Sequence, residues 1–467
     1  MKNEIIFFRI VSNKCLPLQC AFTSQNMMSK SCIIRLSVER FLSVKGCANE
    51  TFISELQTKA AGMPFELYTF PNGVRLVHQR IESPVAYCAL MMNAGSRDEL
   101  KNEYGVAHLV EHLMFKETGK RKAHHILSRI ENVGGELNAF TSKEDTCIHA
   151  AFLNSHYARS LELFSDMVFN HKVTDKVLQL EKNVVIDEIR ATKDSPPELI
   201  FDHFDELLFP NHPLGRNTLG TAYSVGKLDK TDVERFVARN YHPDQMVVSS
   251  VGNIHFQRLI AIVEKYFGGM EPKPQAVVPR TVPEISVSFE KHINKRNHQS
   301  HCIIGVRCDG SDLEYRIAVS MLANLLGGPG MNTRLNMSLR ERYGWVYHVE
   351  AAYTPYSDVG VFNVYFATDK AKLENCVVEI EKELDRLKKE LLTEKQLKRL
   401  QLQMMGQLAI ASDHHDARML SAGKSLLMFD KVDNLHDLCM QINKINAECL
   451  CDVANKIFRN LSFLTYR

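Results

Sequence analysis

An apolar strand pattern followed by a helix occurs twice in this sequence, at widely separated places. In the first copy, the strand pattern at 87–92 precedes a helix that opens near Glu103. In the second copy, the pattern at 302–307 precedes a helix that opens near Glu314, 211 residues later (314 − 103 = 211). A repeat of this length predicts two structural units that are built alike.

A second pair of helix patterns supports the duplication. One long helix pattern runs on from Leu180 in the first half, and another begins at Thr393 in the second half, so the order of the elements is kept. The chain has 467 residues, of which 45% are hydrophobic and 24% are charged, so it is long enough for more than one core. We therefore predict an α+β fold with two homologous halves, each a sheet covered by helices.

Two changes in composition divide the chain into four segments. Residues 1–62 carry 8 basic and 4 acidic residues and show no clear period, whereas a hairpin pattern begins at Met63. Residues 268–284 contain four prolines in a polar stretch, which is typical of an extended linker. We predict an N-terminal extension (1–62), a first half (63–267), a linker (268–284) and a second half (285–467).

Three interpretations of residues 1–62 compete: a targeting presequence, a disordered extension, or a translation start placed upstream of the natural one at Met63. The basic character favours the first, but the acidic residues weaken it, and we favour the third. The 12 cysteines of the chain include no CxxC pair, which is typical of reduced thiols. We expect a cytoplasmic protein, or one of the mitochondrial matrix if residues 1–62 are a presequence.

The composition excludes two kinds of partner. The formal net charge is +2, and no basic stripe interleaved with aromatic residues is present, so we expect no nucleic acid. No apolar run approaches the length that spans a bilayer, so we also expect no membrane.

A short apolar helix at 105–115 carries three ionisable groups. His108 and His112 are four residues apart and stack on one face, and Glu111 projects to nearly the same side. Two imidazoles one turn apart can bind one Zn²⁺, and a carboxylate beside them can take a proton from the water on the metal. This order, H-x-x-E-H, is the reverse of the commoner metalloprotease motif.

The alternative is that both histidines are core residues satisfied by backbone carbonyls. Burying three ionisable groups without a counter-charge would cost several kcal/mol, which a divalent cation removes, so we favour the metal. A catalytic site needs a third protein ligand. The helix pattern at 178–193 offers Glu181 and Glu188 on one face, and composition alone does not choose between them.

His108, Glu111 and His112, followed by Glu181 and Glu188, resemble the inverzincin peptidases, which include pitrilysin, insulysin and the mitochondrial processing peptidases. In that family the third ligand lies some 75 residues beyond the second histidine, and here the spacing is 188 − 112 = 76. The resemblance implies Glu188 as the third zinc ligand, Glu181 as its supporting carboxylate and Glu111 as the general base. It extends from Met63 to the C-terminus and is closest to small two-module bacterial members.

The resemblance also implies substrate-binding residues. The stretch at 134–141 is similar to the family's substrate-edge strand and includes Asn138, Ala139 and Phe140; a simple turn and edge strand is an equal alternative. A strand edge can pair with an extended peptide with little sequence preference. Arg340 and Tyr347 resemble a pair that reaches the active site from the second half and would anchor the peptide carbonyl and stabilise the oxyanion. The alternative is a surface arginine and a packed strand tyrosine.

The repeat predicts that the second half binds no metal. Aligning Glu314 with Glu103 places Val319, Leu322 and Ala323 at the positions of His108, Glu111 and His112. Aligning Glu394 with Glu181 places Gln401 at Glu188. The second half is therefore expected to serve structure and substrate contact.

We expect a zinc metalloendopeptidase whose two halves close like a clamshell around an extended or unfolded peptide. Family members with two modules generally act as dimers, so we expect a homodimer or a heterodimer with a related subunit. Three alternatives stay open: a non-catalytic partner subunit, a metal-binding scaffold without hydrolysis, and a mitochondrial processing peptidase.

Overall fold

A computed structural model of the chain describes most of it from residue 64 onward. The described residues are 64–271, 278–284, 288–295, 298–310 and 312–467. The three interpretations of residues 1–62 concern a segment that lies outside the described residues. Among the described helices, none is both long and apolar enough to cross a membrane.

The first half is built on a sheet with six described strands, in the order β1-β2-β6-β3-β5-β4. The predicted hairpin forms its first pair, because Gly73 turns the chain with a φ of +94°, a conformation that glycine adopts without strain. The strand β3 has the run VAYCALMM and pairs on both sides, which explains its nearly continuous burial. The strands are β1 (Glu66–Thr69), β2 (Arg75–Arg80), β3 (Val85–Met92), β4 (Glu136–Thr141), β5 (Thr146–Leu153) and β6 (Met246–Gly252).

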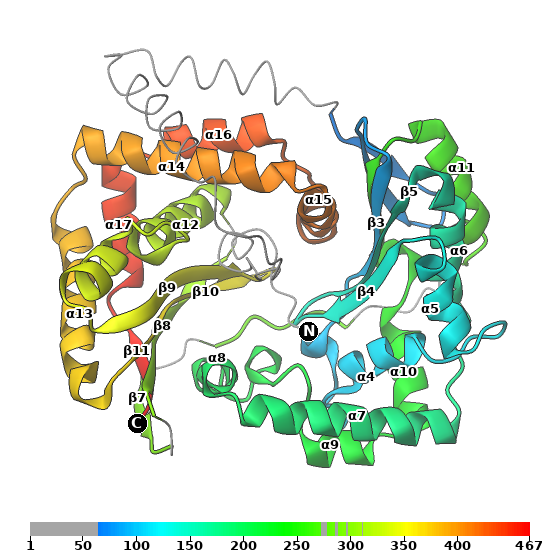
Figure 1. Ribbon diagram of the computed structural model, residues 1–467, viewed down its shortest axis with the longest axis horizontal. Coiled ribbons are helices and arrows are strands. Elements are labelled where there is room, and N and C mark those ends of the chain that lie inside the picture. The colour runs from blue at the N-terminus through cyan, green and yellow to red at the C-terminus, as the bar shows by residue number, and fades with distance from the viewer. Residues whose placement is uncertain (1–63, 272–277, 285–287, 296–297, 311) are drawn as a thin grey trace, which may run out of the picture.

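Helices cover this sheet and enclose a large apolar core (Figure 1). In this core, residues of α4, α6, α10 and α11 pack on one face of the sheet, against side chains of β3. The helices are α4 (Val106–Met114), α5 (Ala123–Glu131), α6 (Tyr157–Phe169), α7 (Asp175–Lys193), α8 (Pro196–Leu208), α9 (Ala222–Lys227), α10 (Lys230–Asn240) and α11 (Phe256–Phe267).

The second half repeats the plan with a sheet in the order β7-β11-β8-β10-β9. Its core is a separate apolar cluster formed by the sheet with α12, α13, α14, α16 and α17. The strands are β7 (Glu290–Ile293), β8 (Ser300–Asp309), β9 (Val346–Pro355), β10 (Val359–Thr368) and β11 (Ser462–Tyr466). The helices are α12 (Leu313–Gly327), the short π-helix η5 (Asn336–Arg342), α13 (Leu373–Lys389), α14 (Glu394–Asp413), α15 (His415–Phe429), α16 (Leu435–Lys444) and α17 (Ala447–Ile457).

This architecture confirms the predicted fold class: two halves, each a sheet with helices, face each other as in a clamshell (Figure 1). Each half has the same succession of strand, helix, strand pair and long helices, namely β3, α4, β4–β5, α6 and α7 in the first and β8, α12, β9–β10, α13 and α14 in the second. In both halves a late strand, β6 or β11, returns to the middle of the sheet. The eight described cysteines are free thiols, and six of them are buried.

The structure corrects one part of the predicted repeat alignment. Gln401 on α14 donates to the carbonyl oxygen of Ile445, immediately before the N-cap of α17. In the same way Lys182 on α7 donates to the carbonyl oxygen of Leu228, immediately before the N-cap of α10. Gln401 is therefore the counterpart of Lys182, and its predicted match to Glu188 is wrong. The prediction aligned Glu394 with Glu181, but Glu394 is the first residue of α14, whereas α7 begins at Asp175, six residues before Glu181 (181 − 175 = 6).

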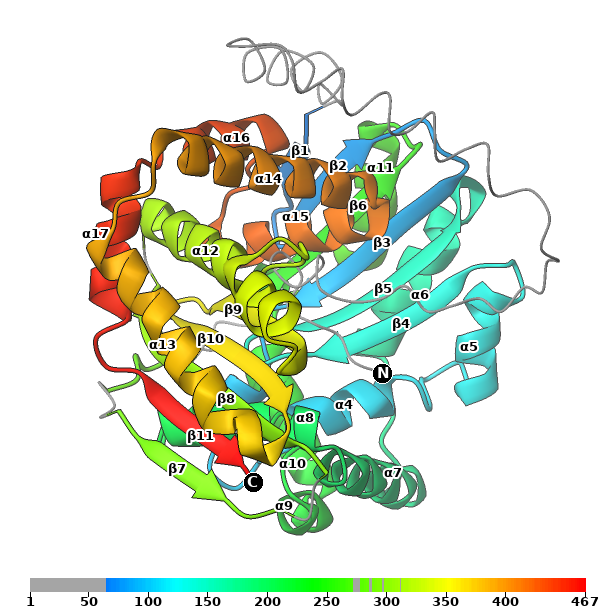
Figure 2. The same cartoon turned by 60° about the vertical axis from the view of Figure 1, so that its left-hand side comes forward.

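Two helices cross between the halves and hold them together. The helix α15 follows α14 in the second half, yet it packs on the free face of the first sheet against β3 and β6 (Figures 1 and 2). Gly423 permits this approach, since a Cβ there would lie 2.8 Å from Met91 Sδ and from Ser249 Cβ. Reciprocally, α8 of the first half packs on the second sheet, where Phe204 fits over Gly305.

Candidate metal centre

The helix α4 brings the H-x-x-E-H residues to the edge of the first sheet. It begins after Gly105, whose φ of +90° and close approach to Leu219 O exclude a side chain there. The buried Glu99 carboxyl group accepts hydrogen bonds from the N–H groups of Gly105 and Ala107, so these two free donors at the start of the helix are satisfied. Burial is the main reason that the pKa of Glu99 is raised to about 8. Sequence analysis did not identify Glu99.

The structure brings together the three residues expected to hold zinc, although 76 residues separate the last two (188 − 112 = 76). Glu188 Oε2 lies 3.7 Å from His108 Nε2 and 3.7 Å from His112 Nε2. The three donor atoms all lie within 4.8 Å of one another. Within the described part of the chain, this is the one group of at least three such side chains with metal-site spacing.

These distances and the chemistry of the donors fit zinc. In a tetrahedral site with bonds of about 2.0–2.1 Å, two ligand atoms are about 3.3–3.4 Å apart, close to the spacing from Glu188 to each histidine. Burial, and secondarily the neighbouring His112, lowers the pKa of His108 to about 3, so its imidazole is neutral and has a lone pair for a metal. Two imidazoles and one carboxylate form the donor set of a catalytic zinc site.

Glu181 supports the centre from the same helix as Glu188. Its Oε2 lies 3.3 Å from His112 Nδ1, which leaves Nε2 of that ring directed at Glu188. Its Oε1 lies 3.1 Å from Lys116 Nζ. Burial opposes ionisation, but the contacts with His112 and Lys116 outweigh it and hold the pKa of Glu181 below its usual value. This arrangement orients the imidazole and makes it a stronger ligand.

Glu111 lies beside the three donors without taking part in the group. Its Oε2 accepts a hydrogen bond of 2.7 Å from the hydroxyl of Thr141 at the end of β4. Burial raises the pKa of Glu111, although the hydrogen bond from Thr141 acts in the opposite direction. A carboxylate with a raised pKa, next to a metal position, is suited to accept and return a proton.

The predicted substrate-edge segment is the outer strand of the first sheet. β4 pairs with β5 on one side, and the described sheet continues no further on the other. Asn138 is exposed, Ala139 half-buried and Phe140 buried. Ala139 faces the core of the first half, whereas Phe140 points to the opposite face of the strand and joins the apolar cluster that includes α15. The edge position is thus confirmed, and α4 packs against this same strand.

Arg340 and Tyr347 lie at the corresponding edge of the second sheet. Arg340 is on η5 and Tyr347 on β9, and the guanidinium carbon is 5.7 Å from the centre of the tyrosine ring. Tyr347 is 85% exposed, so it is not a packed strand tyrosine. Among the described hydrogen bonds, none joins either residue to Glu111 or to the three donors, so the structure pairs them without placing them in the centre.

Sequence analysis also missed Thr141 and Lys116. The spacing of Lys116, one helical turn after His112, was a usable signal for a cation near the supporting carboxylate. Thr141 ends the edge-strand segment, and its contact depends on how α4 packs on β4. No local pattern specifies that packing.

Comparison with known proteins agrees with this geometry. Residues 75–222 match the family model described as insulinase (peptidase family M16), and residues 227–404 match the model described as peptidase M16 inactive domain. The second match begins at residue 227 and so includes α10, β6 and α11, which belong to the first half. The boundary between the two family models therefore does not coincide with the boundary between the two halves of the structure. The ligand helices α4 and α7 both lie within the first match.

An uncharacterized zinc protease of Mycobacterium leprae is 32% identical, over 83% of this chain and 88% of the relative. The zinc protease YmxG of Bacillus subtilis is 31% identical, over 84% of this chain and 95% of the relative. A protease from Helicobacter pylori has the same fold, with a TM-score of 0.82, 22% identity and coverage of 86% of this chain and 99% of that one. The chain therefore belongs to the insulinase family of peptidases, family M16, in which its curated relatives are named zinc proteases.

Proposed function

We propose that this protein is a zinc metalloendopeptidase that hydrolyses peptide bonds in extended or unfolded peptides. One observation carries the proposal: His108, His112 and Glu188 converge at the spacing of zinc ligands. Glu111 stands next to them, held at the edge strand β4. The family membership supports a zinc peptidase, and the residue roles are our own assignment.

A zinc ion bound by the three donors would lower the pKa of a coordinated water and polarise the scissile carbonyl. Glu111 accepts the proton of the attacking water and then donates it to the leaving amine nitrogen, so the carboxylate is regenerated. Glu181 keeps His112 in the tautomer whose Nε2 faces Glu188. These roles need no other titratable group of the first half.

The proposed substrate lies along β4. The backbone of the edge strand at Asn138, Ala139 and Phe140 would pair with an extended peptide as an added strand, which gives affinity through the main chain. A folded protein rarely offers a free extended segment, which is why the proposal names extended or unfolded peptides. Arg340 and Tyr347 would reach this peptide from the second half and contact its carbonyl groups, since Tyr347 is exposed on the edge strand β9 and Arg340 lies beside it on η5.

The proposed assembly is a homodimer or a heterodimer with a related subunit. The mass of the purified chain in solution, measured by light scattering, tests it. A dimer supports the proposal. A chain that is monomeric and fully active alone refutes it.

The experiment that tests the function uses the purified full chain and an unfolded fluorogenic peptide. We expect cleavage that a zinc chelator abolishes and zinc restores. In Glu111→Gln we expect zinc content to stay the same and kcat to fall by about 10²–10⁴-fold. A chain that binds zinc but leaves the peptide intact would favour a metal-binding scaffold, and a chain that does neither would favour a non-catalytic subunit.

A further inference from the structure

The carboxylate of Glu111 is held by a single side chain. Thr141 Oγ1 donates to Oε2 at 2.7 Å, and in the described part of the chain this is the one hydrogen bond that the Glu111 side chain accepts. The two residues come from different elements, α4 and the edge strand β4. The position of Glu111 therefore depends on where the end of β4 lies.

The turn that follows Thr141 has a defined internal structure. Ser142 Oγ donates to Asp145 Oδ1 at 2.6 Å, and Ser142 N donates to the carbonyl oxygen of Asp145 at 2.8 Å. This turn joins β4 to β5 and projects Glu144, whose side chain is only 3% exposed. A buried carboxylate must be paired, so the partners of Glu144 decide where the turn sits.

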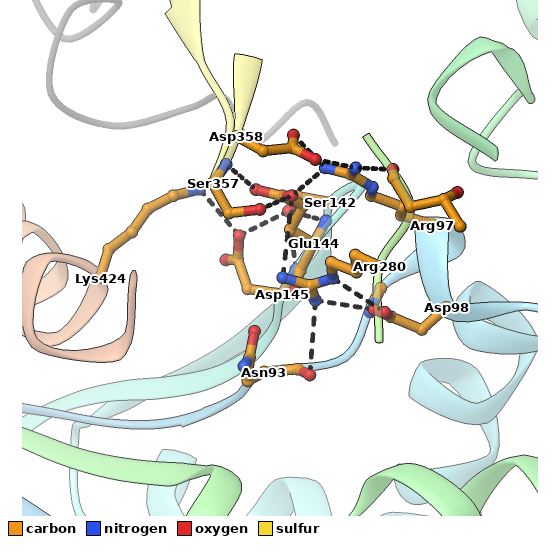
Figure 3. A network of polar contacts seen from close by, with 12 residues as sticks. Asn93, Arg97, Asp98, Ser142, Glu144, Asp145, Arg280, Ser357, Asp358 and Lys424 are labelled. Atoms are coloured by element: carbon orange, nitrogen blue, oxygen red, sulfur yellow. Dashed lines mark hydrogen bonds and ion pairs between the residues drawn. The ribbon is translucent and has the colours of Figure 1, made fainter. Parts of the chain in front are cut away.

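Partners from both halves surround Glu144 (Figure 3). From the first half, Arg97 Nη1 donates to Glu144 Oε1 at 2.7 Å. From the second half, the turn between β9 and β10 supplies Ser357, whose N–H and Oγ donate to Glu144 at 2.9 and 2.6 Å. From the linker, Arg280 Nη2 donates to the carbonyl oxygen of Glu144 at 2.7 Å.

The second half reinforces this arrangement at two further points. Asp358 accepts both Nη1 and Nη2 of the buried Arg97, at 2.8 and 2.5 Å. Lys424 on α15 contacts Asp145 in the turn at 2.7 Å. We call Arg97, Glu144, Arg280, Ser357, Asp358 and Lys424 the turn clamp. Bidentate and buried pairs of this kind fix geometry more firmly than surface pairs do.

We propose that Thr141 is a positioning residue for the general base, and that the second half fixes Thr141 through the turn clamp. This inference rests on the proposed function, because it takes Glu111 as the base. It gives the half that lacks metal ligands a part in catalysis that is separate from substrate contact: it holds the strand end on which the base depends.

The first test compares two variants of Thr141. Thr141→Val keeps the shape and removes the hydroxyl, whereas Thr141→Ser keeps the hydroxyl. In Thr141→Val we expect kcat to fall about ten- to a hundredfold, the worth of a hydrogen bond to a charged group, with KM and zinc affinity unchanged. Thr141→Ser should recover most of kcat. Equal kcat in Thr141→Val and the wild type, or equal losses in both variants, would overturn the inference.

The second test asks whether the clamp acts through Thr141. Asp358→Ala should lower kcat in the wild-type background and have little further effect in Thr141→Val, because the contact it supports is already gone. Asp430→Asn is the matched control. It weakens another ion pair between the two halves, that of Arg75 with Asp430, which lies far along the chain from the turn between β4 and β5. It should leave kcat unchanged. Ser357→Ala, which removes one hydroxyl, replaces Asp358→Ala if that variant unfolds.

The outcomes separate this inference from the proposed function. If the wild type is inactive or Glu111→Gln is fully active, the proposed function fails. If the wild type is active, Glu111→Gln is inactive and the losses of Asp358→Ala and Thr141→Val simply add, the clamp does not act through Thr141 and the inference fails. Zinc content and melting temperature, measured for every variant, show whether a loss of kcat comes from lost metal or lost folding.

Discussion

Replacing Glu181 tests the metal centre without touching a residue assigned as a ligand. The carboxylate accepts from His112 Nδ1 at 3.3 Å and from Lys116 Nζ at 3.1 Å, and its side chain is only 6% exposed. Glu181→Gln keeps an acceptor for the imidazole but loses the negative charge, which also leaves Lys116 as an uncompensated cation beside the metal position. Both effects weaken the binding of a dication.

The expected magnitude follows from such supporting contacts in zinc sites, whose loss lowers metal affinity by about 10–100-fold, or about 1.4–2.8 kcal/mol. We expect about tenfold for Glu181→Gln and about a hundredfold for Glu181→Ala, which also removes the acceptor. The assay is zinc titration against a competing chromogenic chelator at constant pH. The matched control is Asp187→Asn, since Asp187 is on the same helix but its side chain is 73% exposed and, among the described residues, its ion pair is with the surface residue Arg190. Equal zinc affinities for Glu181→Ala and Asp187→Asn would refute the reasoning.

Three further results are expected. Gly423→Ala should lower the free energy of unfolding by about 1–3 kcal/mol, because the new Cβ would meet Met91. Gly406→Ala, inside α14 with open space around it, should raise the free energy of unfolding by about 0.4–1 kcal/mol. Chemical denaturation measures both, and equal effects of the two substitutions would contradict the packing. Burial lowers the pKa of His78 to about 4, so below pH 6.5 the unfolded chain binds a proton at His78 that the folded chain does not bind. The free energy of unfolding should therefore fall by up to about 3 kcal/mol between pH 6.5 and pH 4. His78→Gln should flatten this dependence on pH, and an unchanged dependence would contradict the role of His78. Tyr347→Phe should reduce kcat/KM for peptides at unchanged zinc content, and full activity would remove the tyrosine from the proposed site.

The motif helix could be predicted from the sequence because its information is local. The spacing of His108 and His112 places both on one helical face whatever the rest of the chain does. The third ligand could not be chosen in this way, since Glu181 and Glu188 share a face and lie far along the chain from the histidines. The family resemblance singled out Glu188, and the structure gives a physical reason: Glu188 faces both Nε2 atoms, while Glu181 is next to the opposite nitrogen of His112.

The duplicated halves were predictable from repeated patterns, but the register of the repeat was not. The helix α7 begins at Asp175, well before Glu181, because Thr174 caps it, whereas α14 begins at Glu394 itself. Matching short strings near Glu181 and Glu394 therefore displaced the alignment by several residues. Helix starts depend on caps as well as on apolar periodicity.

The crossing of α8 and α15 between the halves could not be predicted from patterning. An amphipathic helix shows which of its faces is apolar, but not which sheet that face will cover. The close approach of Gly423 to the first sheet, and the fit of Phe204 over Gly305 on the second, are properties of the assembled fold. The contact of Thr141 with Glu111 is of the same kind.

The most direct measurement is an anomalous difference map at the zinc absorption edge from crystals of the full chain. We expect one strong peak per chain, about 2.0–2.2 Å from the Nε2 atoms of His108 and His112 and from a carboxylate oxygen of Glu188. The peak should persist in Glu111→Gln and vanish in Glu188→Gln. A peak elsewhere, or one that remains at full height in Glu188→Gln, would contradict the assignment of the metal centre.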